Sequence, residues 1–258
     1  MNNYIKLLNN LEELGLLNIR NNIDTYLNLI NSGEKSIVDA LYELSNLELK
    51  SKQEKAILAC VKVANFPFLK EIDDFEFEFQ PSINKQQILD LKSLRFVENN
   101  ENVLFVGTPG VGKTHLATSL GIECAKHRYS TYFIHFQELM MQLKKALAEN
   151  RLESRLKHFS KYKVLIIDEV GYLPIDTDAA NIFFQLISKR YEKHSTIITT
   201  NMPFSNWGEV FGSATIANAI LDRLLHHSHV ISIKGPSYRL KSKINYFNSS
   251  SHSSSASS

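Results

Sequence analysis

Apolar side chains in the first 70 residues recur at helical spacing, and this region is expected to contain helices only. Leu7, Leu11 and Leu14 follow the i, i+4, i+7 pattern of one helix face, which predicts a helix that Gly15 ends. A second helix is expected over about 21–31.

A third helix is expected to begin after Ser36, which offers an N-cap, with Asp39 three residues later in the manner of a capping box. The helical pattern continues to about residue 64, and Ser45 and Ser51 are the positions where it could break. The sequence therefore predicts a small all-helical N-terminal domain over 1–70.

Residues 71–246 follow a different pattern, in which short apolar runs alternate with amphipathic stretches. Acidic residues and Phe alternate over 74–79, which predicts a short strand or an extended lead-in, and a helix is expected over 84–98. Further strands are predicted at 103–106, 131–135, 163–168, 195–200 and 229–233, and helices at about 114–127, 136–148, 151–159, 178–192 and 215–226. Strands that alternate with helices indicate an α/β domain whose parallel sheet is covered on both faces.

Composition adds few constraints to this picture. The net charge of +2 favours no particular partner, although residues 217–246 carry a local excess of four positive charges. Cys60 and Cys124 lack the spacing of a zinc site and are expected to be buried free thiols in a reducing cytoplasm. Residues 247–258 form a serine-rich tail that is expected to be disordered.

The chain is also expected to have no membrane partner. No apolar run approaches the roughly 20 residues of a membrane-spanning helix. The first residues lack the basic and apolar regions of a secretory signal.

The strongest motif is the phosphate-binding pattern G-x-x-x-x-G-K-[ST], which lies between the strand at 103–106 and the helix after it. Glycines let the loop turn its N–H groups toward phosphate oxygens, and the helix N-terminus adds a positive dipole end. Lys113 is expected to reach the β- and γ-phosphates of ATP, and Thr114 to bind Mg²⁺. A glycine-rich turn without a ligand is the alternative, which the flanking strand and helix disfavour. The motif consists of Gly107, Thr108, Pro109, Gly110, Val111, Gly112, Lys113 and Thr114.

Two acidic residues follow the apolar run 164–167, at the carboxyl end of a predicted buried strand, where parallel sheets bind ligands. Asp168 is expected to hold Mg²⁺, and Glu169 to polarise the attacking water as a general base. The alternative is that both residues only cap the next helix. The additional strand at 131–135, between the two motifs, favours ATP hydrolysis over transfer to a small acceptor.

Three more polar residues are candidates for the same chemistry. Asn201 follows the strand at 195–200 and could orient the water, although it could also be a turn residue before Pro203. Arg223 and Arg239 are candidates for stabilising transition-state charge, against the simpler interpretation as solvated charges.

These residues resemble the IstB family of transposition helper ATPases, AAA+ proteins related to the helicase loader DnaC. The resemblance covers roughly residues 3–245. It rests on 107–117, 166–174, 200–204, 207–211, 220–227 and 237–241, and the stretches 74–77 and 94–98 also fit.

The resemblance implies an AAA+ fold with sheet order 5-1-4-3-2 and an N-terminal domain that binds DNA or a partner. It implies ATP-dependent assembly of a homo-oligomer on double-stranded DNA, bending of that DNA and recruitment of an IstA-like transposase. Asn201 matches sensor 1, Arg223 the arginine finger acting on a neighbouring subunit, and Arg239 sensor 2. His115 falls within the matching loop segment and is expected to lie at the nucleotide. The basic residues Lys50, Lys52, Lys55 and Lys62 stand where the family tends to be basic.

Two alternatives remain at this point. A helicase loader of the DnaC type would share the fold but dock a helicase through its N-terminal domain. A P-loop kinase of a small metabolite would require an arginine-rich lid, which the sequence does not indicate, and Glu169 and Asn201 argue against it.

Overall fold

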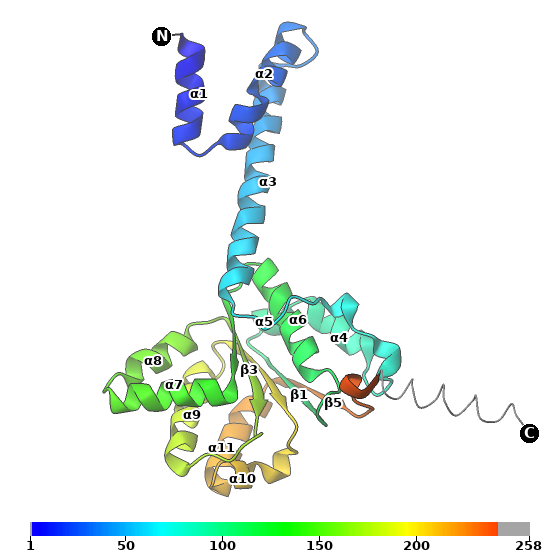
Figure 1. Ribbon diagram of the computed structural model, residues 1–258, viewed down its shortest axis with the longest axis vertical. Coiled ribbons are helices and arrows are strands. Elements are labelled where there is room, and N and C mark those ends of the chain that lie inside the picture. Colours follow the sequence, from blue (N-terminus) through cyan, green and yellow to red (C-terminus); the bar gives the residue numbers. More distant parts are fainter. Residues whose placement is uncertain (1, 242–258) are drawn as a thin grey trace, which may run out of the picture. The chain divides into compact units, whose positions relative to one another are not determined.

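The computed structural model describes residues 2–241, and the chain divides into two compact units, residues 1–59 and 60–258 (Figure 1). The division falls within helix α3 (Ile37–Val63), before the domain boundary predicted at residue 70. The predicted serine-rich tail lies outside the described residues. None of the helices within 2–241 is long and apolar enough to cross a membrane.

The N-terminal unit contains α1 (Asn3–Glu13), α2 (Leu17–Asn31) and most of α3, as predicted. Helix α3 is continuous, so neither serine breaks it. Helix α2 begins before the predicted residue 21 because Glu48, a buried residue of α3, caps it from a distance. Its carboxylate accepts hydrogen bonds from the N–H groups of Asn18 (2.9 Å) and Ile19 (3.4 Å), which have no partner within α2.

The second unit is built on a five-stranded parallel sheet with the order β2-β3-β4-β1-β5, which confirms the predicted topology. Each pair of neighbouring strands runs parallel, and each strand ends toward the same edge. The strands are β1 (Asn102–Gly107), β2 (Thr131–His135), β3 (Val164–Val170), β4 (Ser195–Thr200) and β5 (Ser228–Ile233).

Both faces of the sheet are buried, because alternate residues of each strand enter two separate hydrophobic clusters. In β3, Val164 and Ile166 pack on one side, while Leu165 and Ile167 pack on the other. The first face carries α4 (Lys85–Lys92), α5 (Arg95–Glu98) and α6 (Lys113–Lys126). The second carries α7 (Phe136–Ala148), α8 (Leu152–Ser160), α9 (Thr177–Arg190), α10 (Trp207–Val210) and α11 (Ala214–Leu225).

The segment before β1 differs from the prediction. The alternation over 74–79 forms no strand; it forms two 3-10 turns, η1 (Ile72–Asp74) and η2 (Phe77–Phe79). The phenylalanines alternate because their rings pack on one another and on Tyr238: Phe75 lies 5.0 Å from Phe77 and 5.6 Å from Tyr238. The single helix predicted over 84–98 is two helices, because Leu94 between them adopts a left-handed conformation.

The residues after α3 cover the edge of the sheet that β2 forms. The N–H of Phe133 in β2 donates to the carbonyl of Ala64 (2.8 Å), and the Asn65 side-chain amide donates to the carbonyl of Phe133 (3.0 Å). Edge strands left open invite pairing with other chains. The chain then continues to Phe68, which lines the cavity described below.

Candidate nucleotide site

The loop between β1 and α6 forms one wall of a cavity of about 770 Å³ at the carboxyl edge of the sheet. Gly110 (φ 82°) and Gly112 (φ 101°) adopt the left-handed conformation that residues with a side chain rarely adopt. Such residues turn successive backbone N–H groups toward one side, which makes a concavity that suits anions. Helix α6, which begins at Lys113, adds the positive end of its dipole.

The segments before β1 and after β5 both pack closely against this loop. A Cβ atom on Gly112 would lie 2.5 Å from the ring of Phe75, and one on Gly110 would lie 2.1 Å from the hydroxyl of Ser237. The N–H of Tyr238 donates to the carbonyl of Gly110 (2.9 Å). The glycines are therefore required by close packing as well as by backbone conformation.

Lys113 is buried beneath the loop. Its ammonium donates to the carbonyls of Gly107 and Thr108, both at 2.8 Å. Burial lowers the pKa of Lys113, while the carboxylates of Asp168 and Glu169 act in the opposite direction. The ammonium is held by backbone carbonyls, and phosphate oxygens in the cavity would be stronger partners for it.

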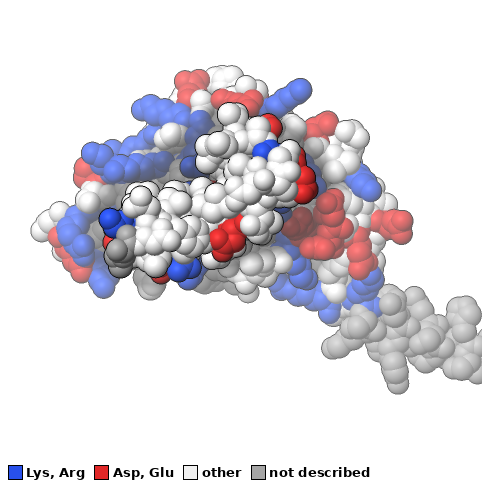
Figure 2. Space-filling model, turned by 90° about the horizontal axis from the view of Figure 1, so that it is seen from above, with Lys and Arg blue, Asp and Glu red and all other residues white. Residues whose placement is uncertain are grey.

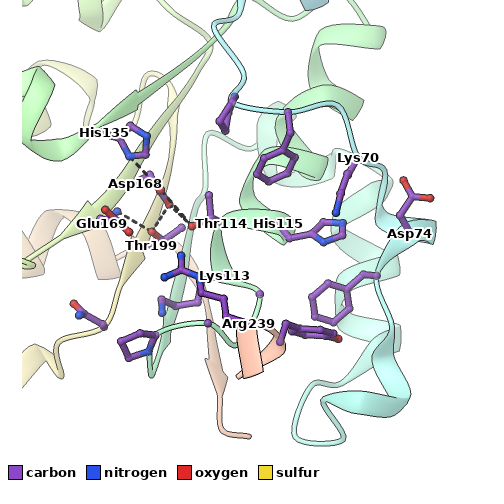
Figure 3. Close-up of a pocket in the computed structure, with 18 of the residues that line it drawn as sticks. Lys70, Asp74, Lys113, Thr114, His115, His135, Asp168, Glu169, Thr199 and Arg239 are labelled. Atoms are coloured by element: carbon purple, nitrogen blue, oxygen red, sulfur yellow. Dashed lines mark hydrogen bonds and ion pairs between the residues drawn. The ribbon is translucent and has the colours of Figure 1, made fainter. Parts of the chain in front are cut away.

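Asp168 lies at the centre of the site and is 1% exposed (Figure 3). The hydroxyl of Thr114 donates to its carboxylate, with distances of 2.9 and 3.2 Å to the two oxygens. The hydroxyl of Thr199 donates to Oδ1 at 2.6 Å. Thr114 and Asp168, the two predicted magnesium ligands, are thus brought together from α6 and β3.

Glu169 lines the same cavity as Asp168, although adjacent strand residues ordinarily face opposite sides. It adopts a left-handed conformation (φ 60°), and the pairing of β3 with β4 shifts register between Ile167 and Val170. Its backbone N–H donates to the hydroxyl of Thr199 (2.9 Å). This irregularity places two consecutive carboxylates at one site, and strained backbone of this kind is concentrated at functional sites.

Asn201 and Arg239 also line the cavity. The side-chain oxygen of Asn201 is buried and accepts no hydrogen bond from the described residues, so it can accept one from a bound water. Arg239 is exposed on η4 (Tyr238–Leu240), the turn that packs on the phosphate-binding loop.

Arg223 lies elsewhere. It is on α11 and is not among the residues that line the cavity. Its guanidinium donates to the carbonyl of Ala219 (3.0 Å) and lies 4.5 Å from the centre of the Phe184 ring. Thr108 is also absent from the cavity lining, and its carbonyl accepts the hydrogen bond from Lys113. The other predicted polar site residues line one cavity within one chain: Lys113, Thr114, His115, Asp168, Glu169, Asn201 and Arg239.

Val111 and His115, the other two predicted residues, lie in different environments: one is buried in the hydrophobic core and the other lines the cavity. The side chain of Val111 is fully buried in the hydrophobic cluster that includes α6, so only its backbone is available to a ligand. His115 lines the cavity, its Nε2 lies 3.2 Å from the carbonyl of Glu71, and burial lowers its pKa.

Several residues of the cavity were not singled out from the sequence. His135 ends β2 and Thr199 lies near the end of β4, so both could have been found by extending the rule for strand ends to every parallel strand. The remaining residues come from loops and 3-10 turns that local patterns do not place: Pro67, Phe68, Lys70, Asp74, Phe75, Glu76, Tyr172 and Tyr238.

These groups fit a nucleotide and its metal ion. Mg²⁺ prefers oxygen ligands, and the Thr114 hydroxyl and Asp168 carboxylate supply them at one point. Phosphates require N–H donors and a cation, which the loop and Lys113 supply.

The sheet order, the loop between β1 and α6, and the carboxylates at the end of β3 define an AAA+ P-loop protein. The chain belongs to the family of IstB-like ATP-binding proteins, which it matches over residues 9–246.

Relatives within this family carry names that refer to insertion sequences and ATP binding. One, named for IS232 of Bacillus thuringiensis subsp. berliner, is 56% identical over 240 residues, which is 93% of this chain and 96% of the relative. Another, named for IS5376 of Geobacillus stearothermophilus, is 45% identical and covers 81% of this chain and 83% of its own length.

Solved structures support the same fold. The crystal structure of DnaI superposes with a TM-score of 0.55 at 21% identity, covering 64% of this chain and 90% of DnaI. The DnaC helicase loader gives a TM-score of 0.50 at 24% identity, covering 66% of this chain and 97% of DnaC.

Proposed function

We propose that this protein is a Mg²⁺-dependent ATPase that assembles on double-stranded DNA, bends it and recruits the transposase of an insertion sequence. The observation that carries the proposal is the convergence of Thr114, Asp168 and Glu169 on one cavity beneath the phosphate-binding loop. The names of the relatives supply the insertion-sequence context.

In this proposal the loop N–H groups and Lys113 bind the β- and γ-phosphates of ATP. Thr114 and Asp168 hold Mg²⁺, which would neutralise charge on the phosphate oxygens. Hydrolysis breaks the bond between the γ-phosphorus and the oxygen that bridges it to the β-phosphorus, while a water oxygen bonds to the γ-phosphorus. The bridging oxygen leaves as part of ADP. Glu169 accepts a proton from the water, and the unpartnered oxygen of Asn201 accepts a hydrogen bond from it.

The two arginines are proposed to act in different subunits. Arg239 lines its own cavity and is proposed to contact the phosphates bound there. Arg223 lies outside that cavity, so it is proposed to reach the γ-phosphate of a neighbouring subunit. An arginine supplied in this way couples hydrolysis to assembly, because the site is complete only between two chains.

The proposed DNA-binding surface is the basic face of α7 and α8. Residues 144–163 contain seven basic and two acidic residues. Figure 2 shows Lys and Arg gathered on the left of the view, the side on which Figure 1 draws these helices. Lys157 and Lys161 are exposed and form no ion pair with the described residues. Free basic side chains on one face favour contact with DNA phosphates.

The N-terminal unit is proposed to dock the transposase. Four apolar residues of α3 lie on one helix face, at i, i+3, i+4 and i+11, and stand out into solvent: Val38, Leu41, Tyr42 and Leu49, which are 55–75% exposed. A stripe of this kind suits an apolar partner surface. The exposed lysines that follow it, at 50, 52 and 55, could add DNA contacts.

Electrophoresis of the protein with long duplex DNA tests this function. We expect ATP-dependent complexes that weaken with salt. Replacing Lys157 and Lys161 by Ala should reduce the slope of log affinity against log salt by about 2. Lys85→Ala, on α4 at the opposite face of the sheet, is the matched control and should leave the slope unchanged. DNA binding without nucleotide by a protein that stays monomeric would contradict the proposal.

The likeness to DnaC and DnaI favours one alternative, a helicase loader. Co-purification of the full chain with an IstA-like transposase is compared with co-purification with a replicative helicase, and this comparison separates the two functions. Retention of the transposase alone supports the helper function, and retention of the helicase alone supports the loader.

A further inference from the structure

His135 occupies a position at the site that the proposed ATPase chemistry does not use. It is the last residue of β2, which pairs with β3 so that His135 lies opposite Asp168 in register. Its Nδ1 atom lies 3.4 Å from Oδ2 of Asp168. Figure 3 shows the His135 ring and the Thr114 hydroxyl on either side of the Asp168 carboxylate.

The two oxygens of Asp168 are not equivalent. Oδ1 accepts short hydrogen bonds from Thr199 (2.6 Å) and Thr114 (2.9 Å). In the part of the chain that the structure describes, the one hydrogen bond to Oδ2 is the longer contact with Thr114 (3.2 Å), and Oδ2 faces the His135 ring. Oδ2 is therefore the oxygen that is freer to bind a cation, and it is the one beside a nitrogen ligand.

The cluster has the dimensions of a metal site. One ligand atom each from His135, Asp168 and Glu169 lie within 4.8 Å of one another. Adjacent ligands around an octahedral ion with bonds of about 2.1 Å lie about 3 Å apart. The 3.4 Å between Nδ1 and Oδ2 is close to that separation, so small side-chain movements would let both bind one ion.

The position of the ring is limited by its surroundings. The backbone of His135 is fixed by the β2–β3 pairing, and its ring packs edge-on against Phe133, with 5.2 Å between ring centres and 89° between planes. The side chain is 50% exposed, so the ring can still turn toward an ion in the cavity.

We propose that His135 supplies a nitrogen ligand, through Nδ1, to the divalent cation held by Thr114 and Asp168. This rests on the proposed function, because that cation is the one the ATPase requires. An imidazole ligand favours first-row transition ions over Mg²⁺, whose preferred ligands are oxygens. The site therefore takes Mn²⁺ or Co²⁺ more tightly than a site of hydroxyl and carboxylate alone.

Electron spin-echo spectroscopy of Mn²⁺ bound to the full chain with ADP tests this directly. We expect modulation from a directly coordinated ¹⁴N nucleus, converted to a ¹⁵N pattern when the protein is labelled with ¹⁵N-histidine. The labelling separates a histidine ligand from the adenine nitrogens. His135→Ala should abolish the nitrogen coupling and weaken Mn²⁺ binding by about tenfold or more, with a smaller effect on Mg²⁺ binding.

The matched control is the second histidine cluster of the described residues, in which His226 and His227 lie with Glu192. Replacing both His226 and His227 by Ala should leave the coupling unchanged. Mn²⁺ that couples to the ADP phosphorus without any histidine nitrogen would overturn the role of His135 while leaving the nucleotide site intact. If Mn²⁺·ADP does not bind, the proposed ATPase function fails as well.

Discussion

The hydroxyl of Thr199 donates to Oδ1 of Asp168 at 2.6 Å and, in turn, accepts a hydrogen bond from the backbone N–H of Glu169 at 2.9 Å. One side chain of β4 thus holds both the carboxylate of Asp168 and the backbone of Glu169 at the end of β3. The orientation of the proposed magnesium ligand and that of the proposed general base depend on the same hydroxyl.

Thr199→Val keeps the shape of this side chain and removes the hydroxyl. We expect turnover of ATP to fall by about 10- to 100-fold, as when a group that orients a metal ligand is lost. The free energy of unfolding should fall by about 1–3 kcal/mol because the buried carboxylate of Asp168 loses a hydrogen-bond donor. Phosphate release and urea unfolding measure the two effects. Thr199→Ser should restore most of both, and equal activity of the Val and wild-type proteins would refute the assignment.

Lys113→Met removes the ammonium that the loop carbonyls hold. Nucleotide binding should be lost, and with it the stabilisation that a ligand at 100 times its dissociation constant gives, about 2.7 kcal/mol. Unfolding with and without ADP measures the difference. ADP should raise the free energy of unfolding of the wild-type protein but not that of the variant. A variant stabilised by ADP as strongly as wild type would place the phosphates elsewhere.

Arg190 should contribute far more to the free energy of unfolding than Lys189, its neighbour in α9. Its fully buried guanidinium donates to the carbonyls of Phe159 (3.0 Å) and Tyr162 (2.8 Å) and to the hydroxyl of Thr196 (3.0 Å). Burial lowers its pKa, and no carboxylate among residues 2–241 forms an ion pair with it to offset that cost. Arg190→Met leaves these acceptors without a donor and should lower the free energy of unfolding by about 3 kcal/mol or more.

Denaturation in urea checks this value, and Lys189→Ala is the control. Lys189 forms an exposed ion pair with Glu153 (2.8 Å), which is expected to contribute less than about 1 kcal/mol. Similar losses for the two variants would show that the Arg190 network is not what joins α8 to the start of β4.

Arg223 and Arg239 should behave differently when variants are mixed. Either single change to Ala should lower turnover, by about a thousandfold for Arg223 if it acts as an arginine finger. Lys113→Ala binds no ATP but still carries Arg223. Mixing it with Arg223→Ala should therefore restore phosphate release, because one chain supplies the ATP and the other the arginine.

Mixing Lys113→Ala with Arg239→Ala should restore nothing, because Arg239 serves the cavity of its own chain. Restoration in both mixtures, or in neither, would contradict this division of roles.

Local sequence patterns were sufficient to predict the strands of the sheet and some of the site residues. The apolar run of β3 and the motif ending at Thr114 each lie within one strand–loop segment, so their pattern and their chemistry are local. Sheet order came from the family resemblance, and the structure confirms it.

What the sequence could not predict depends on contacts between distant residues. The start of α2 is set by Glu48, about 30 residues away, and the 3-10 turns at 72–79 depend on packing against Tyr238. The left-handed conformation of Glu169 places it beside Asp168, and no propensity of Glu indicates it. His135 is a different case, because it ends a strand that the sequence predicted, and the rule for strand ends would have indicated it had the rule been applied to β2.

The most direct test of the central claim, that ATP hydrolysis at Glu169 controls assembly on DNA, is a comparison of Glu169→Gln with wild type on long duplex DNA. Both phosphate release and the lifetime of the complex after dilution into ATP-free buffer would be recorded. We predict that the variant binds ATP and DNA, loses turnover by about 100-fold or more, and forms complexes that outlast those of wild type. Normal ATP hydrolysis by Glu169→Gln would contradict the account.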